Sequence, residues 1–152
     1  MVKLSTDFNA HVMLASMAGG QTTAEHERVY AAIAELDRSG QGHSAPIGFV
    51  YLVARDNPAP DAYWRRRFAQ QRKTFGSPHV YLSIVTQSPL MRGVLTAMNW
   101  IVPQPRHMTS QTHATFDECA TWIESVQGTS PAVLRRLRDE ALPTAGDAKR
   151  AG

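Results

Sequence analysis

The segment SIVTQSPLMRGVLTAMNW, Ser83–Trp100, joins a predicted strand directly to a predicted helix. The strand is the apolar run Val80–Val85, whose β-branched and large side chains are typical of a strand buried on both faces. Ser88 is a favoured helix N-cap and Pro89 a favoured first helical residue. Apolar side chains then recur at helical spacing, at Met91, Val94, Leu95, Met98 and Ile101. A buried strand followed at once by an amphipathic helix indicates an α/β fold.

Three other segments have the composition of strands. His11–Met17 alternates weakly, and we expect it to belong to a hairpin that starts near Lys3. Ile47–Ala54 is an almost continuous apolar run, which again favours a strand buried on both faces. Arg106–Ser110 is a weaker candidate and would form an edge strand.

Capping residues mark where the other helices should begin, because their side-chain oxygens accept from free N–H groups of the first turn. They are Thr22 with Glu25, Asp61, Thr115 with Glu118, and Ser130 before Pro131. We therefore expect a single α/β domain over residues 1–142, with a mostly parallel central sheet of four to five strands and four to five helices. Residues 143–152 are small and polar, and are predicted to form a flexible tail.

Composition favours a globular protein of the cytoplasm. The chain has 152 residues, of which 43% are hydrophobic and 19% charged, and this balance argues against disorder. A single cysteine, Cys119, allows no internal disulfide. The N-terminus does not resemble a signal peptide, and no apolar run approaches the roughly 20 residues needed to span a bilayer. The net charge of +3 allows a polyanion-binding patch but does not require one.

The residues that could bind a ligand or take part in catalysis also have simpler, structural interpretations. Arg65–Arg67 with Arg72 and Lys73 could bind nucleic acid, a nucleotide or anionic lipid, but a solvated helix face is favoured, because no nucleic-acid motif accompanies them. Cys119 lies on an apolar helix face and is predicted to be an inert core thiol. The sequence contains no nucleophile, phosphate-loop or paired-histidine motif, so it indicates no catalytic residue, no metal site and no cofactor.

The best candidate ligand site is the edge of the sheet where the parallel strands end. Asp56 and Asn57 follow one predicted strand, and Thr86 and Ser88 follow the next. Ligands of open α/β sheets bind beyond the carboxyl ends of the strands, and a helix N-terminus there can hold an anion. Arg92, one turn later, could contact a ligand or pair with Asp56. The favoured alternative is structural: Ser88 caps the helix and binds nothing else.

The second half of the sequence resembles a known family. VYLSIVTQSPLMRGVLTAMNW, residues 80–100, followed by THATFDECATWIESV, residues 112–126, is similar to the C-terminal half of STAS domains of the SpoIIAA-like type. The resemblance covers Leu4–Val126 in layout and Val80–Ile123 in detail. It implies a STAS-like α/β fold and a non-catalytic regulatory or protein-interaction module.

One motif of the switched STAS antagonists does not carry over. Their strand–Asp-Ser-Ser-Gly–helix junction, with its phosphorylated serine, corresponds here to VARDNPAPDAYW, which has no hydroxyl residue between Arg55 and Asp61. We therefore expect a regulatory module without this phospho-switch, whose partner is another protein or a second copy of the chain. Trp100, with Met91 and Met98, is read as core or as part of a subunit interface, and these side chains could instead line a small apolar cavity. The alternative function is binding of a small ligand, an anion, nucleotide or lipid, at the carboxyl ends of the strands.

Overall fold

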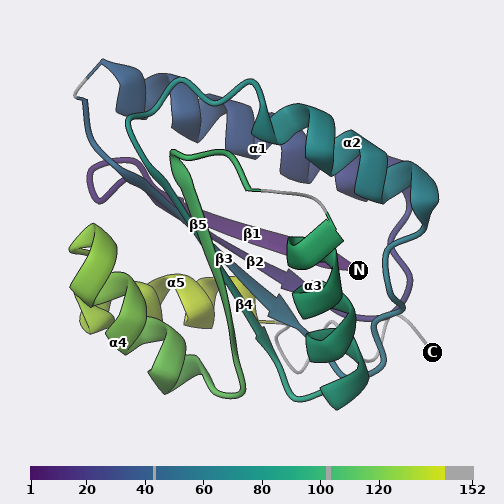
Figure 1. Ribbon diagram of the computed structural model, residues 1–152. Coiled ribbons are helices and arrows are strands. Elements are labelled where there is room, and N and C mark those ends of the chain that lie inside the picture. The colour runs from purple at the N-terminus through teal and green to yellow at the C-terminus, as the bar shows by residue number, and fades with distance from the viewer. Residues whose placement is uncertain (43, 102–103, 143–152) are drawn as a thin grey trace.

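The computed structural model describes residues 1–42, 44–101 and 104–142, without the side chains of 98–101 (Figure 1). The predicted tail at 143–152 and the side chains of Met98, Trp100 and Ile101 lie outside this part of the chain. The strands are β1 Val2–Asp7, β2 Val12–Met17, β3 Ile47–Val53, β4 Val80–Thr86 and β5 Met108–His113. The helices are α1 Thr23–Gln41, α2 Ala62–Arg72, α3 Pro89–Ile101, α4 Phe116–Gln127 and α5 Pro131–Ala141.

The strands form one sheet in the order β1-β2-β3-β4-β5. β1 pairs antiparallel with β2, and β2 to β5 are parallel to their neighbours. In the β1–β2 turn, His11 adopts a left-handed φ of 53° and the Asp7 carboxylate accepts from the Ala10 N–H at 2.9 Å. The predicted mostly parallel α/β sheet is confirmed, with five strands and five helices among the described residues, and so is the predicted N-terminal hairpin.

The helices divide between the two faces of the sheet (Figure 1). α1 and α2 share a hydrophobic core with one face of the sheet, and α3 lies on this face as well. α4 and α5 pack on the other face. Connections between parallel strands strongly prefer one hand. Because β2 to β5 follow one another in chain order, successive connections of one hand place α1, α2 and α3 on the same face. α4 and α5 cover the second face, which a buried parallel sheet also requires.

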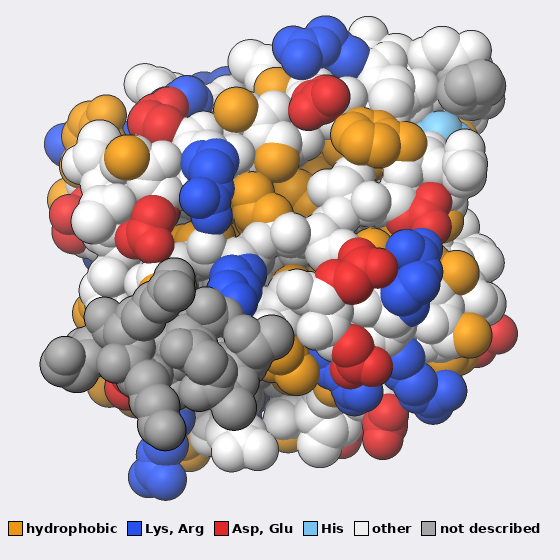
Figure 2. Space-filling model, turned by 180° about the vertical axis from the view of Figure 1, so that it is seen from behind, with side chains coloured by type: hydrophobic (Ala, Val, Ile, Leu, Met, Phe, Trp, Pro, Cys, Tyr) orange, Lys and Arg blue, Asp and Glu red, His pale blue; other side chains and the backbone are white. Residues whose placement is uncertain are grey.

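Side chains alternate between two cores along each strand. On β2, Met13 and Ala15 join the core under α1, whereas Val12 and Leu14 join the core under α4 and α5. Cys119 is fully buried in the second core, and burial raises the pKa of its thiol to about 11. Its prediction as a core thiol is confirmed. Figure 2 shows the molecule from behind, where hydrophobic side chains form small patches among charged and polar groups.

The predicted helix starts are confirmed, and one strand is shifted. Each predicted capping side chain accepts from a first-turn N–H group, at Thr22, Asp61, Thr115 and Ser130. The edge strand covers Met108–His113 rather than Arg106–Ser110. The Pro105 carbonyl accepts from the Met108 N–H at 2.9 Å, so the preceding residues form a turn and the strand begins later.

Asp37, near the end of α1, ties this helix to the segment that enters β4. Its side chain is 5% exposed. One carboxylate oxygen accepts from the Ser77 N–H at 3.0 Å and the Ser77 hydroxyl at 2.7 Å, and the other accepts from the Gly76 N–H at 3.0 Å. Ser77 is buried, so the carboxylate satisfies two donors that are shielded from water.

Replacing Asp37 should therefore weaken the fold. We expect Asp37→Ala to lower the free energy of unfolding by about 2–3 kcal/mol, because buried donors lose their acceptor. Asp56→Ala, at an exposed aspartate, is the matched control and should change it by less than about 0.5 kcal/mol. Urea denaturation of the two variants and the parent measures both values. Equal effects of the two substitutions would contradict this role for Asp37.

Candidate functional site

The junction between β4 and α3 is closed by its own hydrogen bonds. The Thr86 hydroxyl accepts from the Ser88 N–H at 3.2 Å, and the Ser88 hydroxyl accepts from the Met91 N–H at 3.2 Å. Arg92 Nη1 donates to the Thr86 carbonyl at 3.0 Å. Ser88 thus caps α3 as predicted, and Arg92 closes back on the end of its own strand.

Asp56 and Asn57 lie at the same end of the sheet, because Val53 of β3 is paired with Thr86 of β4. Asp56 is exposed, and within the described residues no ion pair joins it to Arg92. The Asn57 side chain accepts from Gln21 Nε2 and donates to the Pro58 carbonyl at 3.1 Å. Of the five candidate ligand-binding residues, only Asn57 borders a described cavity. Ligand binding at all five residues stays a prediction.

A Ser88 series separates capping from anion binding. We expect Ser88→Ala to lower the free energy of unfolding by about 1 kcal/mol, because an N-cap is lost. Ser88→Asp should restore the parent value, because aspartate also caps and suits the positive end of the helix. Thermal and urea denaturation check both variants. If inorganic phosphate stabilised the parent protein but not Ser88→Asp, the junction would bind an anion instead.

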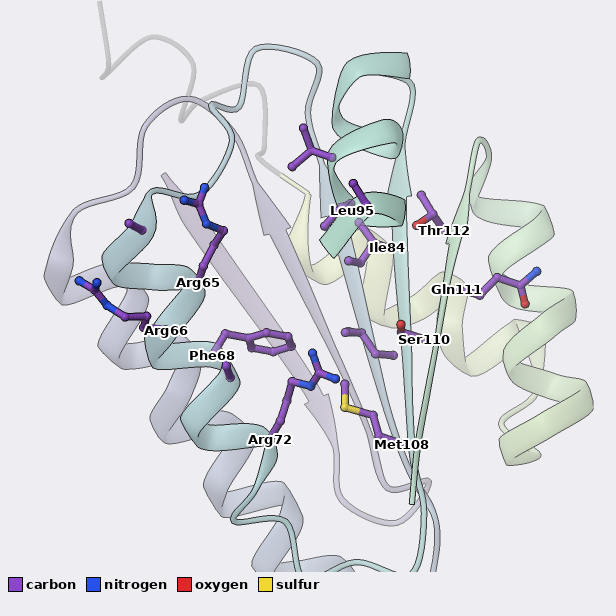
Figure 3. A pocket seen from close by; sticks show the side chains of 15 residues that line it. Arg65, Arg66, Phe68, Arg72, Ile84, Leu95, Met108, Ser110, Gln111 and Thr112 are labelled. Carbon is purple, nitrogen blue, oxygen red and sulfur yellow. The ribbon is translucent and has the colours of Figure 1, made fainter. Parts of the chain in front are cut away.

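The larger of two neighbouring openings lies on the face of the sheet that carries α1, α2 and α3, between α2 and α3 (Figure 3). Its volume is about 540 Å³. Phe68 and Arg72 of α2 form one wall, Leu95 of α3 forms the other, and Leu82 and Ile84 of β4 form the floor. β5 adds Met108, Ser110 and Thr112 along the edge. The walls and floor are mostly apolar.

A second cavity of about 400 Å³ adjoins the first. It extends toward α1 and the carboxyl ends of the strands, where Trp64, Tyr51 and Val53 border it. The two cavities share the lining residues Arg65, Phe68, Leu82, Ile84 and Leu95. We therefore treat them as one continuous feature and call it the α2–α3 groove.

The groove exists because α2 is held on α1. Trp64 stacks on His26 with ring centroids 3.9 Å apart, and Gln71 Nε2 donates to the Tyr30 carbonyl at 3.0 Å. Arg67 lies over the Tyr30 ring at 4.7 Å and pairs with Glu27 at 3.5 Å. α3 sits over β4 and β5 instead. The apolar floor between the two helices, including Ile84, is left only partly covered.

Three polar groups that border the second cavity, Tyr30, Tyr51 and His26, are held in their neutral forms. Burial raises the pKa of Tyr30 to about 12 and raises the pKa of Tyr51 further. Both phenols therefore stay protonated near neutral pH. Burial also lowers the pKa of His26, against the smaller opposing effect of nearby carboxylates such as Asp61. These groups suit an uncharged, weakly polar neighbour.

The lowered pKa of His26 makes stability depend on pH. The unfolded chain binds a proton at the ordinary pKa of about 6.5, whereas the folded chain binds it only at lower pH. The free energy of unfolding should therefore fall as the pH drops below about 6.5. His26→Phe, which keeps an aromatic ring against Trp64, should reduce this fall in urea titrations at successive pH values. An unchanged pH dependence would contradict the assignment.

Arg72 is a charged group at the other end of the groove. It is 6% exposed, and Nη2 is enclosed without a hydrogen-bond partner. Its guanidinium lies 5.7 Å from the Phe68 ring, and burial lowers its pKa. The expectation of a solvated arginine face is therefore wrong for Arg72. A signal was present in the sequence, because Trp64, Phe68 and Arg72 recur every four residues and so share one helix face.

Comparison with models of known protein families, with curated proteins and with solved structures gives no match for the chain. Among the described residues, no helix has the length and apolar character needed to cross a membrane.

Proposed function

We propose that the protein is a non-catalytic α/β domain that binds a small apolar molecule in the α2–α3 groove. The observation that carries the proposal is the groove itself, with adjoining volumes of about 540 and 400 Å³ over an apolar floor. Small-molecule pockets have volumes of roughly 300–1,000 Å³ and are lined mainly by apolar and aromatic side chains.

The energetics of the lining support an occupant. Protein interiors are close-packed, and voids larger than a water molecule are few. Phe68, Ile84 and Leu95 are only half-buried although they border the core. A bound apolar molecule would remove their remaining apolar surface from water, at roughly 25 cal/mol for each Å². The groove thus offers binding energy that the folded chain alone does not use.

The polar groups of the groove support binding rather than catalysis. They include two phenols with raised pKa values, the His26 imidazole and the Arg72 guanidinium. In the described part of the chain no hydrogen bond joins two of these groups. A nucleophile activated by a neighbouring base needs such a contact.

The regulatory, partner-binding role implied by the STAS resemblance is the second candidate. Two exposed apolar side chains favour it: Leu90, in the first turn of α3, is 77% exposed and Tyr63, in the first turn of α2, is 53% exposed. Both lie at the end of the sheet where β3 and β4 terminate. Large exposed apolar groups there would suit contact with another protein or a second copy of the chain.

Filling the groove tests the proposed function. We expect the neutral apolar fluorophore N-phenyl-1-naphthylamine to bind the parent protein saturably with increased emission. Ala69→Trp places an indole in the groove wall and should weaken this binding at least tenfold. Ala132→Trp adds the same side chain at an exposed position of α5 and should leave it unchanged. The proposal is overturned if the parent does not bind, or if both variants behave alike.

A further inference from the structure

Arg72 is the last residue of α2 and lies at the amino ends of β4 and β5, close to Met108. Figure 3 shows its guanidinium pointing from the helix toward the sheet, into the groove. The position is opposite to the strand ends at which the sequence predicted a ligand. One end of the groove therefore holds a buried cation, and the middle of the groove is mostly apolar.

This cation has no carboxylate partner in the described residues. Its exposed fraction is 6%, and its Nη2 has no acceptor. The acidic residue that borders the groove is Asp61, which caps the first turn of α2 by accepting from the Trp64 N–H at 2.9 Å. At 1.5 Å per residue, Asp61 lies roughly 16 Å along the helix from Arg72. A buried charge without a partner is strongly unfavourable.

Two local effects only partly offset this cost. The Phe68 ring at 5.7 Å attracts the cation through its electron-rich face. The last turn of α2 also favours a positive charge, because the helix dipole is negative there. Neither effect supplies a hydrogen-bond acceptor to Nη2. Arg72 thus lines the groove with hydrogen-bonding capacity at Nη2 that the described chain does not use.

We propose that the α2–α3 groove takes a monoanionic amphiphile, with its carboxylate on Arg72 and its apolar chain along Phe68, Ile84 and Leu95. This inference rests on the proposed function and adds the charge of the ligand and its orientation in the groove. A single negative charge is specified because Arg72 is the one buried cation among the groove's described lining residues, whereas Arg65 and Arg66 are exposed. A planar carboxylate also matches the two-pronged geometry of a guanidinium.

A matched pair of ligands tests the charge preference on the unaltered protein. Decanoate and 1-decanol have the same chain length and differ in the head group. Each is titrated against bound N-phenyl-1-naphthylamine, and we expect decanoate to displace the probe at a concentration at least tenfold lower than 1-decanol does. Equal displacement would overturn the role of Arg72 and leave the groove standing. Displacement by neither compound would overturn the proposed function as well.

Substitution of Arg72 tests the same contact from the protein side. Arg72→Met should weaken decanoate binding at least tenfold and leave 1-decanol binding unchanged. Arg72→Lys should keep part of the preference for decanoate. Arg135→Met, at an exposed arginine of α5, is the matched control and should keep all of it. If Arg72→Met no longer bound either ligand, or if it kept the full preference for decanoate, the proposal would be contradicted.

The melting temperature of the ligand-free protein gives an independent readout. A buried, unpaired cation destabilises the free protein, so Arg72→Met should melt at the same temperature as the parent or higher. Decanoate should raise the melting temperature of the parent and not that of Arg72→Met. A structural arginine would give the opposite pattern, with a lower melting temperature for the ligand-free variant.

Discussion

The arrangement of the whole molecule depends on one constraint, the pairing of β2, β3, β4 and β5 as parallel neighbours in chain order. Each connection between these strands must cross a face of the sheet, and connections of the same hand cross the same face. Three helices therefore share one side, and α4 and α5 cover the other. Because α2 is held on α1 by contacts such as Gln71 to Tyr30, a groove opens between α2 and α3.

The groove has a distinct chemistry at each end. Apolar side chains of β4 and α3 form its middle, neutral phenols border the part under α1, and Arg72 stands at the amino ends of the strands. Burial of an unpaired guanidinium opposes folding. A bound anion would offset this cost, so the occupied protein would be more stable than the ligand-free one. In this account binding energy and folding energy are linked through a single side chain, and the apolar lining provides the remaining affinity.

The sequence predicts the local structure well and the site poorly. Helix starts at Thr22, Asp61 and Thr115 follow from side chains that bond within their own first turn, so short-range chemistry suffices. The edge strand was misplaced because the turn at Pro105 and the pairing with β4 are tertiary features. The spacing of Arg72 from Phe68 indicates that both side chains share one helix face and could both be buried. The neighbouring arginines instead favour a solvated face. The depth of the groove depends on how α2 packs on α1. This is a tertiary contact, so no local sequence pattern predicts it.

We have proposed that the α2–α3 groove is the binding site of this domain. Its most direct test is a titration of isotopically labelled protein with N-phenyl-1-naphthylamine, followed by backbone amide chemical shifts in nuclear magnetic resonance spectra. This assignment predicts saturable shifts that cluster at Phe68, Leu82 and Leu95, with little change in α4 and α5. Shifts confined to α4 and α5, or to the β4–α3 junction at Ser88, would contradict it.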